Sequence, residues 1–307
     1  MPIDRRTFVL TAALGVTGVQ LVRAQAQPFP AKPIKWVVGF QAGGGSDMIA
    51  RLLADAMGKH LGQQVLGDNR PGAGGALAAG YAATAPADGY TVVSLDFGTY
   101  ALNPHLYSKV PYNPTRDFKM VGMMVTIPLV LFTNPQVPSG SLAEFVSYVK
   151  SRPPGSVNYA SAGVGSAIHL AMELFTEKAG VRMTHVPYKG TPAALTDVMA
   201  GQVTTLFCDP NTAMPFVKEG RLKALAVAMP KRLEAYPDLP TCAESGYDVE
   251  VPLWVAMGVP AATPAPVVAR LGEGLEAALR DPEVNRRLAS VGVSITPSPA
   301  ASTNEFA

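Results

Sequence analysis

Residues 36–57, WVVGFQAGGGSDMIARLLADAM, give the first indication of how this chain folds. The apolar run stops at Phe40, three glycines follow at positions 43–45, and an amphipathic helical pattern starts at Ser46. This order predicts a strand, a glycine turn and a helix that Ser46 caps. Turns of this kind at the carboxyl end of a strand can hold an anion, but a turn that needs only positive φ and a serine cap has the same pattern.

Short apolar runs alternate with helical patterns along the rest of the chain, which predicts an α/β fold with largely parallel sheets. A second series of strands and helices begins near Ile127, and the run LWVAMGVP near Trp254 predicts a strand that crosses back to the first series. We therefore expect two lobes, one formed by residues 27–126 and 251–307 and the other by residues 127–250. Two crossings between lobes form a hinge, which suits a cleft that closes on a ligand.

The composition favours a large folded core and excludes some partners. Hydrophobic residues make up 48% of the chain and charged residues 16%, so the composition is not that of a disordered protein. The formal net charge is +2, and the basic residues do not gather into a stripe. Nucleic acid is therefore excluded as the main partner.

Residues 1–26 predict an export signal that is removed by cleavage near Ala26. Arg5 and Arg6 precede an apolar stretch, which ends in the small-residue pattern AQA. The paired arginines, followed by Phe8, favour the twin-arginine route. A membrane anchor is the alternative, but the stretch is short and is interrupted by threonines and glycines.

The sequence contains no recognisable metal, cofactor or catalytic motif. Two idle thiols at Cys208 and Cys242 are favoured over a disulfide, although their spacing leaves both possibilities open, and no Cys/His cluster indicates a metal. The run NRPGAGGALAAG has Leu77 where a dinucleotide fingerprint needs a third small residue, and no phosphate-binding Gly-Lys-Ser/Thr run occurs. The run YASAG has Tyr159 where a nucleophile elbow needs a glycine. We expect no cofactor, no metal and no catalytic residue.

A second glycine turn, in NYASAGVGSAIHLAMELF, repeats the pattern of residues 36–57 in the other lobe. Ser161 ends the strand, Gly165 frees the backbone, Ser166 caps the helix, and His169 lies one turn inside it. Two helix N-termini, one from each lobe, can hold a small anion with backbone N–H groups and hydroxyls. We interpret His169 as a packed, hydrogen-bonded histidine rather than a catalyst.

Two more helix starts in the second lobe have capping signatures. Ser141 and Glu144 have the spacing of a capping box. Thr191 is expected to cap the helix predicted in TPAALTDVMAGQ, with Pro192 at the first position of that helix.

Six segments, taken in order, resemble the periplasmic receptors of tripartite tricarboxylate transporters, also called Bug-type solute-binding proteins. They are VVGFQAGGGSDMIARLLA, VLGDNRPGAGGALAAGYAATAPADGYTVV, NYASAGVGSAIHLAMELF, VPYKGTPAALTDVMAGQV, EGRLKALAVA and RLEAYPDLPTCAESGY. The resemblance covers nearly the whole mature chain. It implies a two-lobed type II periplasmic binding fold with mixed, mostly parallel sheets and an interlobe cleft.

The resemblance also implies the ligand class, the site and the partners. The ligands would be small carboxylates, and the partners would be the membrane subunits of a tripartite tricarboxylate-type transporter, with the receptor itself a monomer. The implied ligand-binding residues are Phe40, Gly43, Gly44, Gly45, Ser46, Asp47, Ser161, Gly165, Ser166, His169, Tyr188 and Asp209.

The chain departs from the family pattern at several positions. Gly39 and Ala42 stand where the first loop usually has prolines, and Thr204 stands where an acidic residue is common. The family usually continues with a further helix beyond the position of Ala307, so we expect a truncated C-terminus.

The sequence thus predicts a periplasmic solute-binding receptor that captures a small organic carboxylate and has no enzymatic activity. An exported hydrolase or cofactor enzyme is the rival, because twin-arginine export often carries folded, cofactor-loaded proteins. A receptor of the same fold that reports to a sensor kinase is a third possibility, which nothing in the chain separates from transport.

Overall fold

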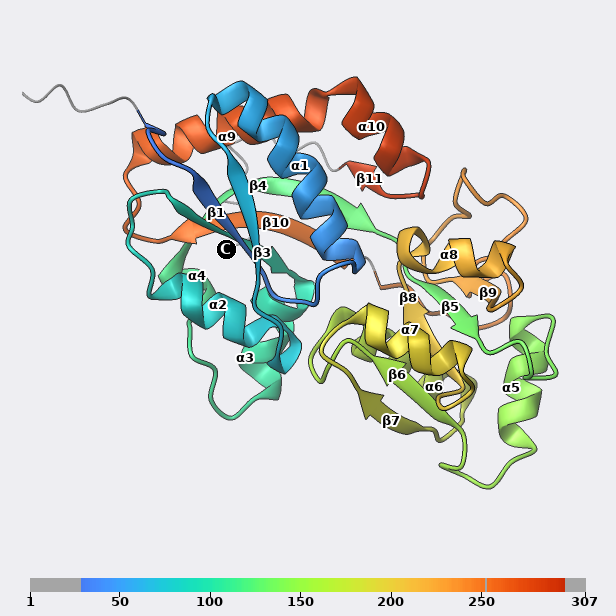
Figure 1. Cartoon of the computed structure of the whole chain (residues 1–307). Helices are drawn as coiled ribbons and strands as arrows, with labels where there is room; N and C mark the ends of the chain where they lie inside the picture. Colours follow the sequence, from blue (N-terminus) through green and yellow to red (C-terminus); the bar gives the residue numbers. More distant parts are fainter. Residues whose placement is uncertain (1–28, 252, 296–307) are drawn as a thin grey trace, which may run out of the picture.

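The computed structural model describes residues 29–251 and 253–295, which form two α/β lobes (Figure 1). Each lobe contains one sheet covered by helices. The predicted export signal and the expected C-terminal truncation lie outside the described residues. Among the described helices, none has the length and apolar character needed to cross a membrane.

The first lobe is built on a six-stranded sheet in the order β11-β4-β10-β3-β1-β2. Its strands are β1 (Ile34–Val38), β2 (Val65–Asn69), β3 (Thr91–Asp96), β4 (Phe118–Ile127), β10 (Leu253–Pro260) and β11 (Ser294–Ile295). Figure 1 shows α1, α9 and α10 over one face and α2 and α3 on the other. The helical segments are α1 (Gly45–Leu61), η1 (Ala73–Gly75), α2 (Ala76–Ala83), η2 (Gly98–Leu102), α3 (Asn103–Leu106), α4 (Pro114–Asp117), α9 (Ala265–Arg280) and α10 (Pro282–Ala289).

The second lobe is built on a five-stranded sheet in the order β7-β6-β8-β5-β9. Its strands are β5 (Val130–Thr133), β6 (Asn158–Ser161), β7 (Thr184–Pro187), β8 (Thr205–Cys208) and β9 (Lys223–Val227). Its helices are α5 (Leu142–Lys150), α6 (Ala167–Ala179), α7 (Thr191–Met199) and α8 (Pro210–Lys218). Phe145 of α5 stacks on Phe175 of α6 in one hydrophobic cluster, whereas Ala194, Leu195 and Val198 of α7 and Ala213 of α8 belong to another.

Both sheets are mixed, and they are less parallel than the alternation of strands and helices predicts. Among the strands that the structure describes, β1 pairs parallel with β2 and β3, and β6 pairs parallel with β7 and β8. β4 runs toward the second lobe and β10 returns from it, so these two strands are antiparallel neighbours. β5 likewise enters its sheet directly from the first lobe, without the helical crossover that parallel neighbours require, and it pairs antiparallel with β8 and β9.

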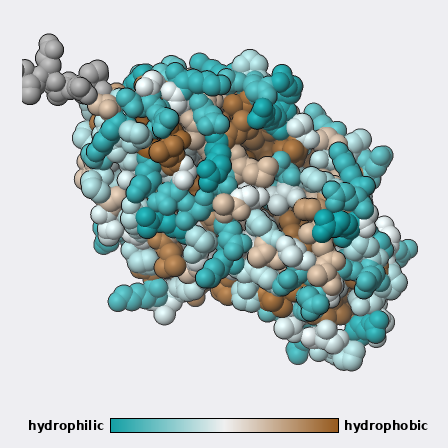
Figure 2. Space-filling model, viewed as in Figure 1, coloured by the Kyte–Doolittle hydropathy of each residue, from teal (hydrophilic) through white to brown (hydrophobic). Residues whose placement is uncertain are grey.

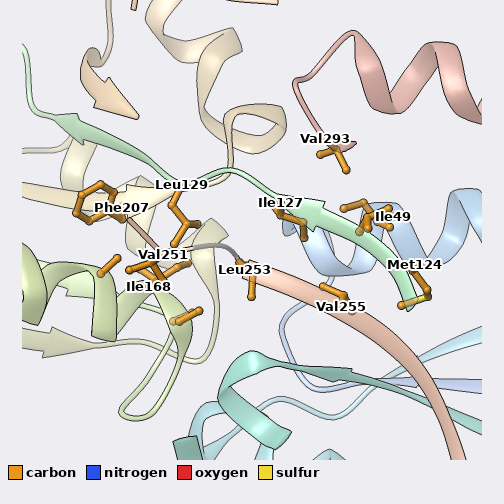
Figure 3. Close-up of a cluster of buried hydrophobic side chains, with 14 of the residues drawn as sticks. Ile49, Met124, Ile127, Leu129, Ile168, Phe207, Val251, Leu253, Val255 and Val293 are labelled. Atoms are coloured by element: carbon orange, nitrogen blue, oxygen red, sulfur yellow. The ribbon is translucent and has the colours of Figure 1, made fainter. Parts of the chain in front are cut away.

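The chain crosses between the two sheets at adjacent places. It passes from β4 to β5 and returns before β10, and Ile127 and Leu253 are register partners at these two crossings. Together with Leu129 and Val251 they are buried in one hydrophobic cluster that reaches into both lobes (Figure 3). The crossings are therefore packed against each other, as a hinge requires. The boundaries at 126/127 and 250/251 stay a proposal for where the lobes divide.

The two cysteines are free and buried. Cys208 ends β8, and the N–H of Cys242 bonds to Val227 of β9, with β5 between those strands. The structure thus supports two separate thiols. Burial raises the pKa of both, that of Cys242 to about 12, so both are protonated and unreactive near neutral pH.

Candidate ligand-binding site

A pocket of about 470 Å³, including its opening to solvent, lies between the lobes next to the two crossings. Its apolar part is formed by Ile127, Leu129 and Leu253 from the crossings and by Ile168 from α6. All four residues are labelled in Figure 3. This part of the pocket suits the carbon skeleton of a small ligand.

Five helical segments begin at this pocket. Gly44 and Ser46 at the start of α1, Ser166 before α6, Thr191 of α7 and Asp209 before α8 all line it. A further lining residue, Asp96, immediately precedes the helical stretch at residues 97–106. Helix N-termini present free N–H groups and partial positive charge, so the pocket suits an anion although no described lysine, arginine or histidine lines it.

Three of these helix starts are already occupied by side-chain caps. The Ser166 hydroxyl accepts the N–H of His169 at 3.2 Å, and the Asp209 carboxylate accepts the N–H of Thr212 at 2.8 Å. Asp96 accepts the N–H of Thr99 at 2.7 Å, and Thr99 Oγ1 accepts the N–H of Asp96 at 2.8 Å. The orphan N–H groups of these first turns are thus partly satisfied within the protein.

No described side chain caps α1 or α7. The residue before α1 is Gly44 and the residue before α7 is Gly190, so the expected caps at Ser46 and Thr191 are both wrong. Ser46 and Thr191 lie inside the first turns, and Pro192 is the second rather than the first residue of its helix. A glycine has no side chain that could accept a hydrogen bond, so these first-turn N–H groups remain available to a ligand.

The two uncapped helix starts come from opposite lobes and lie side by side. A Cβ atom at Gly44 would lie 2.9 Å from Thr191 Oγ1. A carboxylate placed at this junction would contact α1 and α7 at once. Such a ligand would favour the closed arrangement of the lobes, because an open arrangement offers only one of the two helix starts.

The lobes also touch each other on the flanks of the pocket. Tyr107 Oη donates to the Val164 carbonyl at 2.8 Å, and Asn211 Nδ2 lies 3.2 Å from Met48 Sδ. In the space-filling view, atoms of the two lobes meet along their shared border (Figure 2). The structure is therefore that of closed lobes.

Asp209 makes the tightest of these contacts at the start of α1. A Cβ atom at Gly45 would lie 2.5 Å from Asp209 Cγ, so the carboxylate packs directly on the glycine backbone. Burial raises the pKa of Asp209, while hydrogen bonds from Thr212 and Cys208 act in the opposite direction. Only a glycine at position 45 allows this approach.

Asp47 anchors the glycine turn and is not part of the pocket lining. Its buried carboxylate accepts hydrogen bonds from the Gly43 N–H at 2.9 Å, from Arg51 at 3.0 Å and from Asn69 at 2.9 Å. Burial acts to raise the pKa of Asp47, but the bonds from Arg51, Gly43 and Asn69 outweigh it and the pKa is lowered. Asp47 thus holds the turn in place as a carboxylate.

The second glycine turn is supported by a stack of two histidines. His169 and His185 stack with ring centroids 4.2 Å apart, and Ser161 Oγ lies 2.6 Å from His185 Nε2. Ser161 Oγ also accepts the Gly163 N–H at 3.0 Å. Burial lowers the pKa of His169, so both rings pack as neutral imidazoles.

A family model and curated relatives of this chain agree on the family to which it belongs. The family model for the tripartite tricarboxylate transporter family receptors (TctC) matches residues 49–307. This chain belongs to the TctC receptor family. It is 38% identical over 272 residues to an Agrobacterium vitis protein of the UPF0065 group, covering 88% of this chain and 78% of that protein. It is 33% identical to Protein BugT of Bordetella pertussis, covering 93% of this chain and 90% of BugT.

Solved structures agree with the two-lobed periplasmic binding fold. The periplasmic binding protein BugD is 34% identical with a TM-score of 0.85, covering 91% of this chain and 95% of BugD. MatC of Rhodopseudomonas palustris, solved with malate, is 35% identical with a TM-score of 0.84, covering 91% of this chain and 97% of MatC. The α/β fold predicted from the sequence of this TctC receptor is confirmed.

The residues that the sequence singled out in this TctC receptor divide into two groups. Those that line the pocket are Phe40, Gly44, Gly45, Ser46, Ser166 and Asp209. Those that do not line it are Gly43, Asp47, Ser161, Gly165, His169 and Tyr188. Gly43, Asp47, Ser161 and His169 support the two glycine turns, whereas Gly165 contacts Asn103 of the other lobe and Tyr188 Oη donates to Asp197.

Sequence reasoning missed two polar lining residues. Asp96 ends β3 and Thr191 begins α7. The rule that ligands lie beyond the carboxyl ends of strands could have found Asp96, because the strand pattern GYTVVSL stops directly before it. The run KGTP has a glycine directly before a helical pattern, as residues 43–45 do, and this similarity could have indicated Thr191 as a lining residue.

The contact between Tyr107 and Val164 predicts a measurable effect on this TctC receptor. Tyr107→Phe removes a hydrogen bond that only the closed lobes make, which is worth about 0.5–1.5 kcal/mol. We expect ligand binding to weaken roughly 2- to 12-fold. Calorimetric titration measures it, with Tyr148→Phe on α5 as the control, and equal weakening in both variants would contradict a closure-specific role.

Proposed function

We propose that this receptor takes a small organic carboxylate into the interlobe pocket and holds the carboxylate group between the N-termini of α1 and α7. The observation that supports this site is the meeting of two uncapped helix starts from opposite lobes, with Gly44 next to Thr191. The hydroxyls of Ser46, Thr191 and Ser166 line the same pocket and would supply further hydrogen bonds.

The ligand class is supported by solved relatives. One Rhodopseudomonas palustris protein, 34% identical with a TM-score of 0.86, was solved with adipate, and MatC was solved with malate. Both molecules are small carboxylates. The pocket of this chain combines the two features that such molecules need, an apolar section and free backbone N–H groups.

The receptor would act in the periplasm after cleavage of its export signal near Ala26. It would work as a monomer and pass its ligand to the membrane subunits of a tripartite tricarboxylate-type transporter. Closure of the lobes around the ligand would present the loaded form to those subunits.

Calorimetric titration of the protein with a panel of mono-, di- and tricarboxylates tests this proposal. We expect at least one member to bind, and to stabilise the fold by about 2.7 kcal/mol at a concentration 100 times its Kd. Failure of every member to bind or to raise the Tm would overturn the proposal. Turnover of any bound member would favour the exported enzyme instead.

A further inference from the structure

One buried polar atom at the border between the lobes lacks a hydrogen bond. Asn103, the first residue of α3, is 0% exposed, and its Oδ1 has no hydrogen-bond partner among the residues that the structure describes. The other described side-chain atom of this kind, Ser139 Oγ, belongs to the loop between β5 and α5. Such an atom costs free energy, because it has lost its bonds to water without a replacement.

The two polar atoms of the Asn103 amide face different lobes. Nδ2 donates to the Gly74 carbonyl at 3.1 Å, within the first lobe. Burial raises the pKa of Tyr112 to about 12, and a hydrogen bond with Asn103 opposes this rise, as a bond from the donor Nδ2 does. Oδ1 faces the second lobe, where a Cβ atom at Gly165 would lie 2.1 Å from it. The Gly165 N–H points instead to His169 Nδ1, at 3.5 Å.

Only closed lobes cover this oxygen. Gly165 and Asn103 belong to different lobes, so their contact would end when the lobes separate, and water would then reach Oδ1. The bond from Nδ2 to Gly74 lies within one lobe and does not depend on closure. Closure therefore removes water from Oδ1 without supplying a new hydrogen bond, and this opposes the closed arrangement.

The other half of the amide gives a reason for an asparagine at this position. Residues 72–75 all have positive φ, and Ala73, with φ 47°, is not a glycine. The bond from Asn103 to Gly74 fixes the middle of this turn. The turn meets the second lobe, because a Cβ atom at Gly74 would lie 2.4 Å from the Val164 carbonyl oxygen. An apolar side chain at position 103 would leave the turn without this support.

We propose that Asn103 opposes closure of the lobes, so that the empty receptor stays open until a ligand binds. Asn103 then lowers the affinity for any ligand without touching it, because it does not line the pocket. The inference rests on the proposed function only in that the ligand closes the lobes. A receptor that stays open when empty differs in shape from the loaded one, and a membrane partner can distinguish the two.

Small-angle X-ray scattering of the ligand-free protein tests the proposal with two variants. Asn103→Leu has a similar shape and no buried acceptor, whereas Asn103→Asp keeps the acceptor and adds a charge. Both variants lose the bond to Gly74, so that loss cannot explain a difference between them. We expect the ratio of closed to open protein to rise roughly 5- to 150-fold in Asn103→Leu and to fall in Asn103→Asp.

The order of the three proteins decides the outcome. If Asn103 were merely structural, the wild type would be the most compact of the three, and that order would overturn the proposal. A wild type that is already compact without ligand would overturn it as well. Asn285→Leu is the matched control, because this exposed asparagine of α10 also donates through Nδ2 to backbone carbonyls of the first lobe. It should scatter like the wild type.

The Tm of each variant is measured first. If Asn103→Leu unfolds, Asn103→Ala replaces it, because alanine has no side-chain acceptor, adds no bulk and suits a helix. The expected order of compactness stays the same, with the alanine variant above the wild type.

Titration with mono-, di- and tricarboxylates gives a second readout. Any member that binds the wild type should bind Asn103→Leu more tightly, since closure then opposes binding less. Weaker binding by a folded Asn103→Leu would contradict the proposal. If no member binds, the proposed function fails, whereas the scattering of the ligand-free proteins still decides the role of Asn103.

Discussion

Gly45→Ala is expected to weaken ligand binding roughly 5- to 150-fold while leaving the fold as stable as before. The new Cβ atom would lie 2.5 Å from Asp209 Cγ, a distance that closed lobes cannot accept without movement. Overpacking of this kind costs about 1–3 kcal/mol. The cost falls only on the closed form, since Gly45 and Asp209 belong to different lobes. Gly45 has no positive φ, so alanine fits its helical backbone.

Titration calorimetry measures the loss of affinity, and small-angle X-ray scattering shows whether ligand still compacts the protein. Gly67→Ala is the control, because the nearest atoms to its Cβ belong to the flexible end of Arg51 at 3.4 Å. Adding Asp209→Ser to Gly45→Ala should recover closure, since serine is shorter and still caps α8. Unimpaired binding by Gly45→Ala would mean that the closed contact is not part of the bound state.

The fold could be predicted from the sequence because its signals are local. Residues 36–57 have a buried strand, a glycine turn and a helix whose apolar positions recur every three or four residues, and each signal is complete within the segment. Capping by Ser141 and Ser166 was equally local, and both serines cap their helices as predicted. Strand direction was less predictable, because it depends on where β5 and β10 enter from the other lobe.

The two helix caps that were predicted wrongly, Ser46 and Thr191, show that the sequence does not fix the residue at which a helix begins. Gly44 and Gly190 precede α1 and α7, and in each case a hydroxyl residue follows within two positions. A serine or threonine near a helix start is the usual cap, so the simplest interpretation assigned Ser46 and Thr191 to that role. The backbone places both one or two residues later, which frees the N–H groups for a ligand.

The pocket itself arises only when distant segments meet. Asp96, Thr191 and Leu253 come from three separate parts of the chain, and no spacing in the sequence brings them together. The same holds for His169 and His185, which lie on α6 and β7 and stack directly on each other. The contact of His169 with His185 agrees with the interpretation of His169 as a packed histidine. No sequence pattern indicates that His185 is the stacking partner of His169.

The histidine stack makes folding stability sensitive to acid. Burial lowers the pKa of His185 to about 4, and the neighbouring His169 acts in the same direction, while Glu173 opposes both. An unfolded histidine has a pKa near 6.5. Above pH 6.5 both states are neutral and the full stability is present. As the pH falls from 6.5 toward 4, the unfolded chain takes up a proton that the folded chain does not, so stability is lost.

We expect this loss to amount to about 1–3 kcal/mol between pH 6.5 and 4, with allowance for the partly exposed ring. Urea unfolding at several pH values measures it, and His185→Gln should flatten the curve in that window. His105→Gln is the control, because His105 is exposed on α3. The groups around the stack, namely Tyr159, Ser161, His169 and Glu173, remain in both variants. An unchanged slope in His185→Gln would mean that other groups, such as the buried carboxylates, carry the acid sensitivity.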